Sequence, residues 1–161
     1  MLILVIIALI IACFCGVLFF GAPYLPTLKK QIETMLELAE IKPNQRAIEL
    51  GCGDGRVVAA FANRQIYVTG YELNPILYLI AKVRCFKYRP YATIKFGDYW
   101  RADWPETDII YTFLLSRYMA KLDKKCIQYS YKPIKLISFA FKIPNKKPAK
   151  SKNGLYLYKY D

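Results

Sequence analysis

The stretch 47–62, AIELGCGDGRVVAAFA, has the residue types and spacing of a turn that holds a small ligand. Three glycines at alternate positions follow an apolar run, with two acids beside them: Gly51, Gly53, Gly55, Glu49 and Asp54. A dinucleotide fingerprint reads G-x-G-x-x-G, and here Arg56 occupies the place of its last glycine. Because carboxylates beside the turn would repel a pyrophosphate, the turn favours a cationic ligand over a dinucleotide.

Two further acids stand where a nucleoside needs them. Glu72 ends a predicted strand in GYELNP, where a carboxylate can accept hydrogen bonds from both ribose hydroxyls. Asp98 follows the next predicted strand in KFGDYW, where it can accept from an adenine amino group. Each such bond contributes roughly 1.5–3 kcal/mol. Either acid alone could be a helix cap or a surface charge, but with the glycine turn they predict S-adenosylmethionine (SAM), which has an ammonium, a sulfonium and no phosphate.

Strands and helices alternate along the chain, which predicts an α/β, Rossmann-like fold with a mainly parallel sheet and helices on both faces. Apolar runs predict strands over 46–50, 65–72, 92–98, 108–115 and 134–141, and an antiparallel edge strand over 154–160. Helical spacing predicts helices over 32–39, 56–64, 75–88 and 116–130. Ligands bind such sheets outside the carboxyl ends of the strands, so these elements must bring the glycine turn, Glu72 and Asp98 to one edge.

The pattern is that of class I SAM-dependent methyltransferases. PYLPT, MLELAEIKP, ELGCGDGR, GYELNP and DIIYTFLL resemble one lineage of protein lysine methyltransferases. That lineage includes membrane-anchored mitochondrial enzymes acting on the ATP synthase c-subunit and the adenine nucleotide translocase, and archaeal enzymes of broad specificity. The resemblance implies a SAM site made by Glu49, Gly51, Gly53, Asp54, Glu72, Asn74, Asp98 and Tyr99. It also implies that Tyr24, Pro26 and Thr27 belong to a segment that folds over the cofactor.

The chain begins with MLILVIIALIIACFCGVLFF, which contains no charged side chain and no proline. About 20 residues at 1.5 Å each reach roughly 30 Å, the thickness of a bilayer's hydrocarbon. Lys29 and Lys30 are the first cations beyond it, so we expect the remainder to face the cytoplasm. The chain is therefore divided into a single-pass transmembrane anchor (1–22), a linker and helix covering the cofactor site (23–42) and a methyltransferase domain (43–161).

The composition is strongly basic, with 24 Lys and Arg against 12 acids and a net charge of +12. The cations concentrate in KVRCFKYR (82–89) and KIPNKKPAKSK (142–152). Anionic membrane lipid is the simplest partner for such a surface, at about 1 kcal/mol per nearby basic residue, and nucleic acid is the alternative. The absence of histidine excludes histidine-dependent triads, and five cysteines without a CxxC pair argue against a metal site.

The methyl acceptor is expected at the end of the strand over 108–115. Tyr111 and Phe113 could hold an alkylammonium there by cation–π attraction, worth about 0.5–2 kcal/mol, although both could equally be core aromatics. Many nucleic-acid amino-methyltransferases carry an Asn/Asp-Pro-Pro-aromatic motif at this strand, and DIIYTFLL has no proline. Together with the apolar N-terminal stretch, the resemblance implies a membrane-anchored protein lysine methyltransferase acting on a membrane protein. The alternatives are methylation of a lipid or other hydrophobic small molecule, and SAM binding without turnover.

Overall fold

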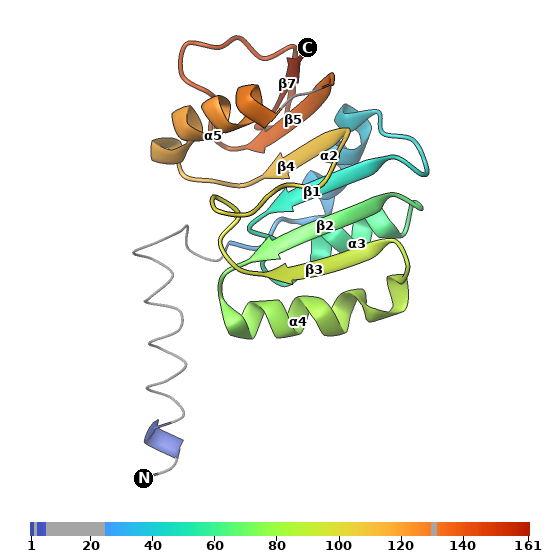
Figure 1. The fold of residues 1–161 in the computed structure, drawn as a ribbon, viewed down its shortest axis with the longest axis vertical. Coiled ribbons are helices and arrows are strands. Elements are labelled where there is room, and N and C mark those ends of the chain that lie inside the picture. Colours follow the sequence, from blue (N-terminus) through green and yellow to red (C-terminus); the bar gives the residue numbers. More distant parts are fainter. Residues whose placement is uncertain (2, 6–24, 130–131) are drawn as a thin grey trace.

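The computed structural model describes residues 1, 3–5, 25–129 and 132–161, and Figure 1 shows a central sheet with helices packed against it. Residues 2 and 6–24, which include most of the predicted anchor, lie outside the described residues, so the anchor stays a prediction. Within the described part, no helix is long and apolar enough to cross a bilayer.

In the described part of the chain, seven strands form one sheet in the order β3-β2-β1-β4-β5-β7-β6. The strands are β1 (Arg46–Leu50), β2 (Tyr67–Glu72), β3 (Ala92–Phe96), β4 (Ile109–Thr112), β5 (Ile134–Phe139), β6 (Lys150–Lys152) and β7 (Leu155–Tyr160). From β3 to β5 all neighbours pair in parallel, and β7 runs antiparallel to both β5 and β6. The predicted mainly parallel sheet is confirmed.

Helices cover both faces of this sheet, as predicted: α2 (Lys29–Ala39), α3 (Arg56–Ala62), α4 (Pro75–Cys85) and α5 (Ser116–Tyr129). The first three share one buried apolar cluster, to which Phe61 and Ala81 belong. The fourth packs into a second cluster through Met119 and Leu122. A 3₁₀ helix, Phe86–Tyr88, continues α4, so the helix predicted over 75–88 forms with a tighter last turn.

One strand prediction is wrong in its placement. The alternating segment predicted as the edge strand forms β7, but β6 pairs along its outer side and is itself the edge. The residues of β6 are Lys150, Ser151 and Lys152, all of them exposed, so no apolar pattern marks them as a strand. Lys150 and Lys152 instead make ion pairs with Glu40 and Glu37, which tie the edge to the end of α2.

The loop between β3 and β4 packs on the same face of the sheet as α5 and shares its apolar cluster. Trp104 in this loop is buried, and its indole N–H donates to the carbonyl of Tyr99 at 2.9 Å. Lys125 of α5 donates to the carbonyl of Trp100 at 2.7 Å. The buried Trp104 and the hydrogen bond from Lys125 therefore hold this loop, which begins directly after Asp98, against the sheet and α5.

The parallel register brings the ends of the first three strands to one edge of the sheet. Leu50 pairs with Tyr71, and Glu72 pairs with Phe96. The glycine turn after β1, Glu72 at the end of β2 and the segment after β3 therefore lie at the same edge, as the alternation of strands and helices predicts. Figure 1 shows that β1, β2 and β3 end on the same side of the sheet.

Candidate cofactor and active site

The glycine turn is held against the neighbouring strand by its backbone. The N–H groups of Gly51 and Cys52 both donate to the carbonyl of Tyr71, at 3.0 and 2.8 Å. Gly51, Gly53 and Gly55 have φ angles of 78°, 54° and 77°, a region that side chains disfavour. At Gly55 a Cβ atom would also lie 2.9 Å from a side-chain atom of α4, so glycine lets α3 and α4 pack closely. The backbone conformation thus explains all three glycines.

Glu72 joins the glycine turn to the start of α4. One carboxylate oxygen accepts the N–H of Gly53 at 2.7 Å, and the other accepts the N–H of Asn74 at 2.8 Å. Burial raises the pKa of Glu72, while these backbone hydrogen bonds oppose that rise. These hydrogen bonds fix the side chain in place, and the carboxylate keeps acceptor capacity for hydroxyl groups.

Asn74 is buried and caps α4 at its first turn. Its side-chain oxygen accepts from the N–H groups of Ile76 and Leu77 at 2.9 and 3.2 Å, and Pro75 supplies the first helical residue. The resemblance places Asn74 in the cofactor site, and the structure brings it beside Glu72. Its observed function is to fix where α4 begins.

Glu49 is the second buried acid at this edge, with only 4% of its surface exposed. One of its carboxylate oxygens has no hydrogen-bond partner in the described part of the chain. Burial raises the pKa of Glu49 well above its usual value; a backbone hydrogen bond from Val58 opposes this, and the charges of Asp54 and Glu72 add to it. An unpartnered buried carboxylate is costly, and a cation placed beside it would relieve that cost.

Asp54 does not present a free charge to a ligand, which corrects the sequence argument at that residue. Its carboxylate binds Arg56 and Arg84, each at 2.8 Å. Burial acts to raise the pKa of Asp54, but the hydrogen bond from Arg56 and the charge of Arg84 outweigh it, so the net shift is downward. Repulsion of a pyrophosphate therefore depends on Glu49 and Glu72.

The segment predicted to cover the cofactor is tied to the turn in its described part. Arg56 donates to the carbonyl of Thr27 at 3.3 Å, and the Thr27 hydroxyl lies 3.4 Å from the hydroxyl of Tyr111. Thr27 is buried, whereas Pro26 is exposed. Tyr24 lies outside the described residues, so its part in the site stays a prediction.

Asp98 and Tyr99 follow β3 at the same edge. The carboxylate of Asp98 accepts the N–H of Trp100 at 2.8 Å, which shapes the chain into a turn, and Arg101 approaches it at 3.7 Å. Burial raises the pKa of Tyr99, and the nearby charges of Asp98 and Glu72 contribute. The binding of a cofactor by Asp98 and Tyr99 stays a prediction.

The two candidate acceptor residues occupy different positions. Tyr111 is only 1% exposed and is the register neighbour of Glu49 on β4, beneath Thr27. Phe113 is partly buried and packs edge-on against Phe139, with ring centroids 4.8 Å apart. In this arrangement Tyr111 holds the covering segment and has no exposed surface to offer an acceptor. A catalytic contribution of either residue stays a prediction.

The sequence did not indicate which residues pair with Asp54 or which residues pack around Trp100. Arg56 and Arg84 neutralise Asp54, although Arg84 lies 30 residues further along the chain. Near Asp98, the ring of Trp100 lies 6.1 Å from that of Tyr118, and the ammonium of Lys121 lies 4.3 Å from the Trp100 ring. The high aromatic content of 99–104 is the one sequence signal that could have indicated this group.

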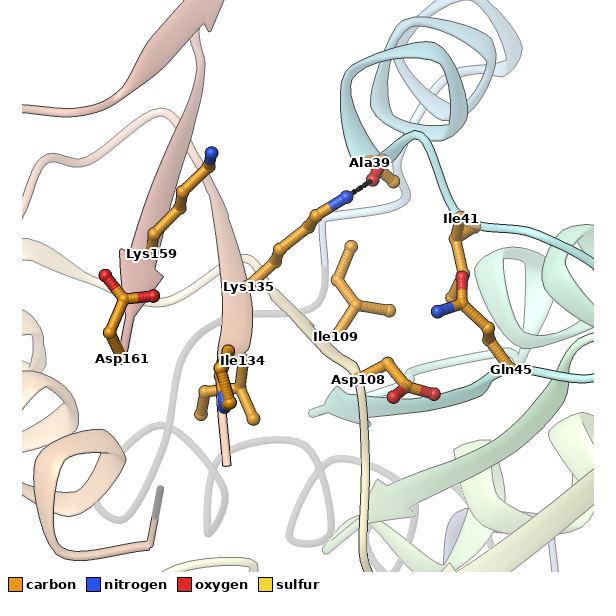
Figure 2. A pocket seen from close by; sticks show the side chains of 10 residues that line it. Ala39, Ile41, Gln45, Asp108, Ile109, Ile134, Lys135, Lys159 and Asp161 are labelled. Atoms are coloured by element: carbon orange, nitrogen blue, oxygen red, sulfur yellow. Dashed lines mark hydrogen bonds between the residues drawn. The ribbon is translucent and has the colours of Figure 1, made fainter. Parts of the chain in front are cut away.

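A cavity of about 250 Å³ lies at the opposite edge of the sheet, away from these residues. Figure 2 shows it between the starts of β4 and β5 and the end of α2, lined by Asp108, Ile109 and Ile134. Lys135 points across it and donates to the carbonyl of Ala39 at 2.7 Å. Because it lies at the amino ends of the strands, this cavity is not part of the candidate cofactor site.

Comparison with known proteins identifies similar sequences. A family model described as "ANTKMT methyltransferase domain" matches residues 49–150, more than half of the chain. The human lysine N-methyltransferase of the ATP synthase C-subunit is 27% identical over 128 residues, covering 78% of this chain and 54% of that protein. A protein-lysine N-methyltransferase of Saccharolobus islandicus is 29% identical over 126 residues, covering 75% and 78%. The chain spans about half the length of its vertebrate relatives.

Solved structures give the same fold. An RNA methyltransferase from Salinibacter ruber in complex with S-adenosyl-L-homocysteine has a TM-score of 0.77 and 25% identity, covering 84% of this chain and 92% of that one. A SAM-dependent methyltransferase from Geobacter sulfurreducens, also with S-adenosyl-L-homocysteine, has a TM-score of 0.60 at 15% identity and shows the fold alone. The predicted Rossmann-like fold of class I is confirmed.

Proposed function

The chain belongs to the ANTKMT methyltransferase domain family, and we propose on this basis that it is a SAM-dependent protein lysine N-methyltransferase attached to a membrane. Two lines support lysine as the acceptor. The vertebrate relatives are named for lysine methylation of the ATP synthase C-subunit, and the archaeal relative is named a protein-lysine N-methyltransferase. The Salinibacter relative, which covers most of this chain, binds the product form of the same cofactor.

The observation that carries the cofactor assignment is the unpartnered, buried carboxylate oxygen of Glu49 beside the glycine turn. Burial raises the pKa of Glu49, so a ligand cation beside this oxygen would stabilise the ionised carboxylate, whereas a phosphate would be repelled by it. The SAM ammonium is a suitable cation, and the fixed carboxylate of Glu72 suits the ribose hydroxyls. We assign the adenine amino group to Asp98, which follows β3.

Bound SAM supplies a methyl group already activated by its sulfonium, so the protein has to align and shield the reaction. The acceptor amine must come within about 3–3.5 Å of the methyl carbon, in line with the breaking bond. The Thr27–Tyr111 contact and the Arg56–Thr27 hydrogen bond hold the covering segment down, which excludes water. A lysine entering this desolvated site loses its proton more readily, so no histidine base is needed.

We extend the proposal to the membrane. The charge-free stretch over 1–22 is long enough to span a bilayer, and the cations after it favour a cytoplasmic catalytic domain. From Phe20 to Leu28 the chain reaches at most about 30 Å. A site tethered so closely meets lysines of membrane proteins at high effective concentration. The acceptor is therefore a cytoplasm-facing lysine of a membrane protein.

RNA methylation is the second candidate, because the Salinibacter relative is named an RNA methyltransferase and the chain carries a net charge of +12. Against it stands the segment 108–115, which lacks the Asn/Asp-Pro-Pro-aromatic motif of many enzymes that methylate base amino groups. Methylation of a lipid or other hydrophobic small molecule remains a third candidate, and a SAM-binding protein without turnover a fourth.

One labelling experiment separates these candidates. The full chain is incubated with methyl-labelled SAM, membranes and total RNA, and the label is followed into protein, lipid extract and RNA. We expect label in a protein band that survives delipidation, at a lysine found by mass spectrometry. Label in RNA or in the solvent extract would replace the proposal with the second or third candidate, and SAM binding without transfer would leave the fourth.

A further inference from the structure

One side of the molecule exposes apolar side chains that the fold does not use. Beyond residue 28, the described chain exposes seven large apolar side chains, and five of them gather on α4, the 3₁₀ helix and β3. These are Leu79, Ile80, Val83, Phe86 and Phe96, between 43% and 79% exposed, and we call them the α4 surface. Leu79, Val83 and Phe86 follow one another at helical spacing, so they share one stripe of the helix.

The charged residues within the segment that carries the α4 surface are all basic, and one of them, Arg84, is paired with Asp54 from the glycine turn. Residues 73–97 contain five Lys and Arg and no acid. Three of these cations lie over rings in the same region: Lys82 over Tyr78 at 5.5 Å, Lys87 over Tyr88 at 5.0 Å, and Arg89 over Phe86 at 4.6 Å. Among the described residues, none of the three forms an ion pair with an acid. Apolar side chains bordered by uncompensated cations match the chemistry of an anionic lipid interface.

We propose that the α4 surface lies in the headgroup region of an anionic bilayer and sets the orientation of the domain, an inference that rests on the proposed membrane attachment. The apolar side chains enter the boundary of the acyl chains, while Lys82, Lys87 and Arg89 reach phosphate groups. The surface stands at the β3 edge of the sheet, and α4 lies along that edge in Figure 1. The described chain places no further strand outside it.

This orientation brings the cofactor edge to the membrane. The first residue of α4, Pro75, comes three positions after Glu72, and Phe96, at the end of β3, comes two positions before Asp98. The ring centroids of Phe96 and Tyr78 lie 5.4 Å apart, so the β3 part of the α4 surface is in contact with the helix. A domain resting on this surface therefore holds its cofactor edge beside the lipid, within reach of a lysine near the bilayer surface.

Fluorescence of the full chain in vesicles tests the proposal. A solvent-sensitive dye is attached at Val83→Cys, or at Gln128→Cys on α5 as a control on the opposite face, with Cys13 and Cys15 replaced by alanine in both. Vesicles are made of phosphatidylcholine with or without phosphatidylglycerol. We expect the emission of the dye at position 83 to shift to the blue and to be quenched by brominated lipid, both only when phosphatidylglycerol is present. The emission of the dye at position 128 should remain that of a dye in water.

Charge removal supplies the second measurement. Lys82→Gln and Lys87→Gln should each lower the ratio of docked to undocked domain about fivefold. A water-like dye at position 83 in anionic vesicles would overturn the proposal. A blue shift of the dye at position 83 that grows with protein concentration in detergent would also overturn the proposal. It would show that a second copy of the chain covers the α4 surface. Flotation of the protein with vesicles tests membrane attachment by the N-terminal segment, and methyl transfer from labelled SAM tests the activity. A negative result in either assay is therefore distinguished from a negative result for docking of the α4 surface.

Discussion

Replacing Glu72 by glutamine tests the cofactor site with the smallest change of shape. Glu72 accepts one backbone N–H with each oxygen, at 2.7 and 2.8 Å, and its remaining lone pairs face the ribose in the proposed complex. A glutamine keeps one acceptor oxygen, so one backbone N–H and one ribose hydroxyl lose their acceptor. Glu72→Gln therefore affects both folding and binding.

The two effects have different sizes. A hydrogen bond to a charged group contributes about 1.5–3 kcal/mol, so SAM should bind Glu72→Gln about 10- to 150-fold more weakly. An unpaired buried N–H costs about 1–3 kcal/mol, but the buried carboxylate already carries a desolvation cost that glutamine lacks. We expect the loss of folding stability to fall at the lower end of that range.

Isothermal titration with SAM measures the affinity, and urea unfolding measures the stability. Glu106→Gln is the matched control, because it removes the same charge from an exposed acid paired with Arg46 and Lys132 at the other edge of the sheet. Equal SAM affinity in Glu72→Gln and Glu106→Gln would show that the nucleoside does not meet Glu72.

Three further predictions concern the same edge. Glu49→Gln should weaken SAM binding. Because burial raises the pKa of Glu49 above its value in the unfolded chain, the free protein loses stability as the pH rises from the unfolded-state pKa to the folded-state pKa. Unfolding measured at several pH values should show this loss in the parent protein and not in the variant. Gly55→Ala should cost about 1–3 kcal/mol more than Gly51→Ala in urea unfolding, since both have left-handed φ but only Gly55 contacts α4; equal costs would refute the packing argument. Tyr111→Phe, which loses the Thr27 contact, should lower stability by about 0.5–1.5 kcal/mol with kcat unchanged, and a large fall in kcat would make Tyr111 catalytic.

Local patterns explain the part of the fold that the sequence predicts. β1 occupies the predicted range 46–50, and the glycine turn and Glu72 lie at the predicted edge, because turn residues and alternating apolar runs act over a few positions. The strand predicted over 108–115 pairs only over Ile109–Thr112. The apolar run continues because Leu114 is buried in the second cluster, so it packs without belonging to the sheet.

Contacts between distant segments could not be predicted in this way. Arg84 reaches Asp54 because α4 packs on α3, and no sequence pattern at either position indicates that the two residues form an ion pair. β6 carries only polar side chains and forms because β7 presents an open edge. Residue type and spacing thus indicate the candidate site residues, whereas the charge balance among them depends on the tertiary structure.

A crystal structure of the full chain with S-adenosyl-L-homocysteine tests the central claim most directly. We predict that the ribose hydroxyls bind the carboxylate of Glu72, that the amino group lies near the unpartnered oxygen of Glu49, and that the adenine lies beside Asp98. A nucleoside bound away from the ends of β1, β2 and β3, or a Glu72 carboxylate that contacts only the backbone of Gly53 and Asn74 in the complex, would contradict the account.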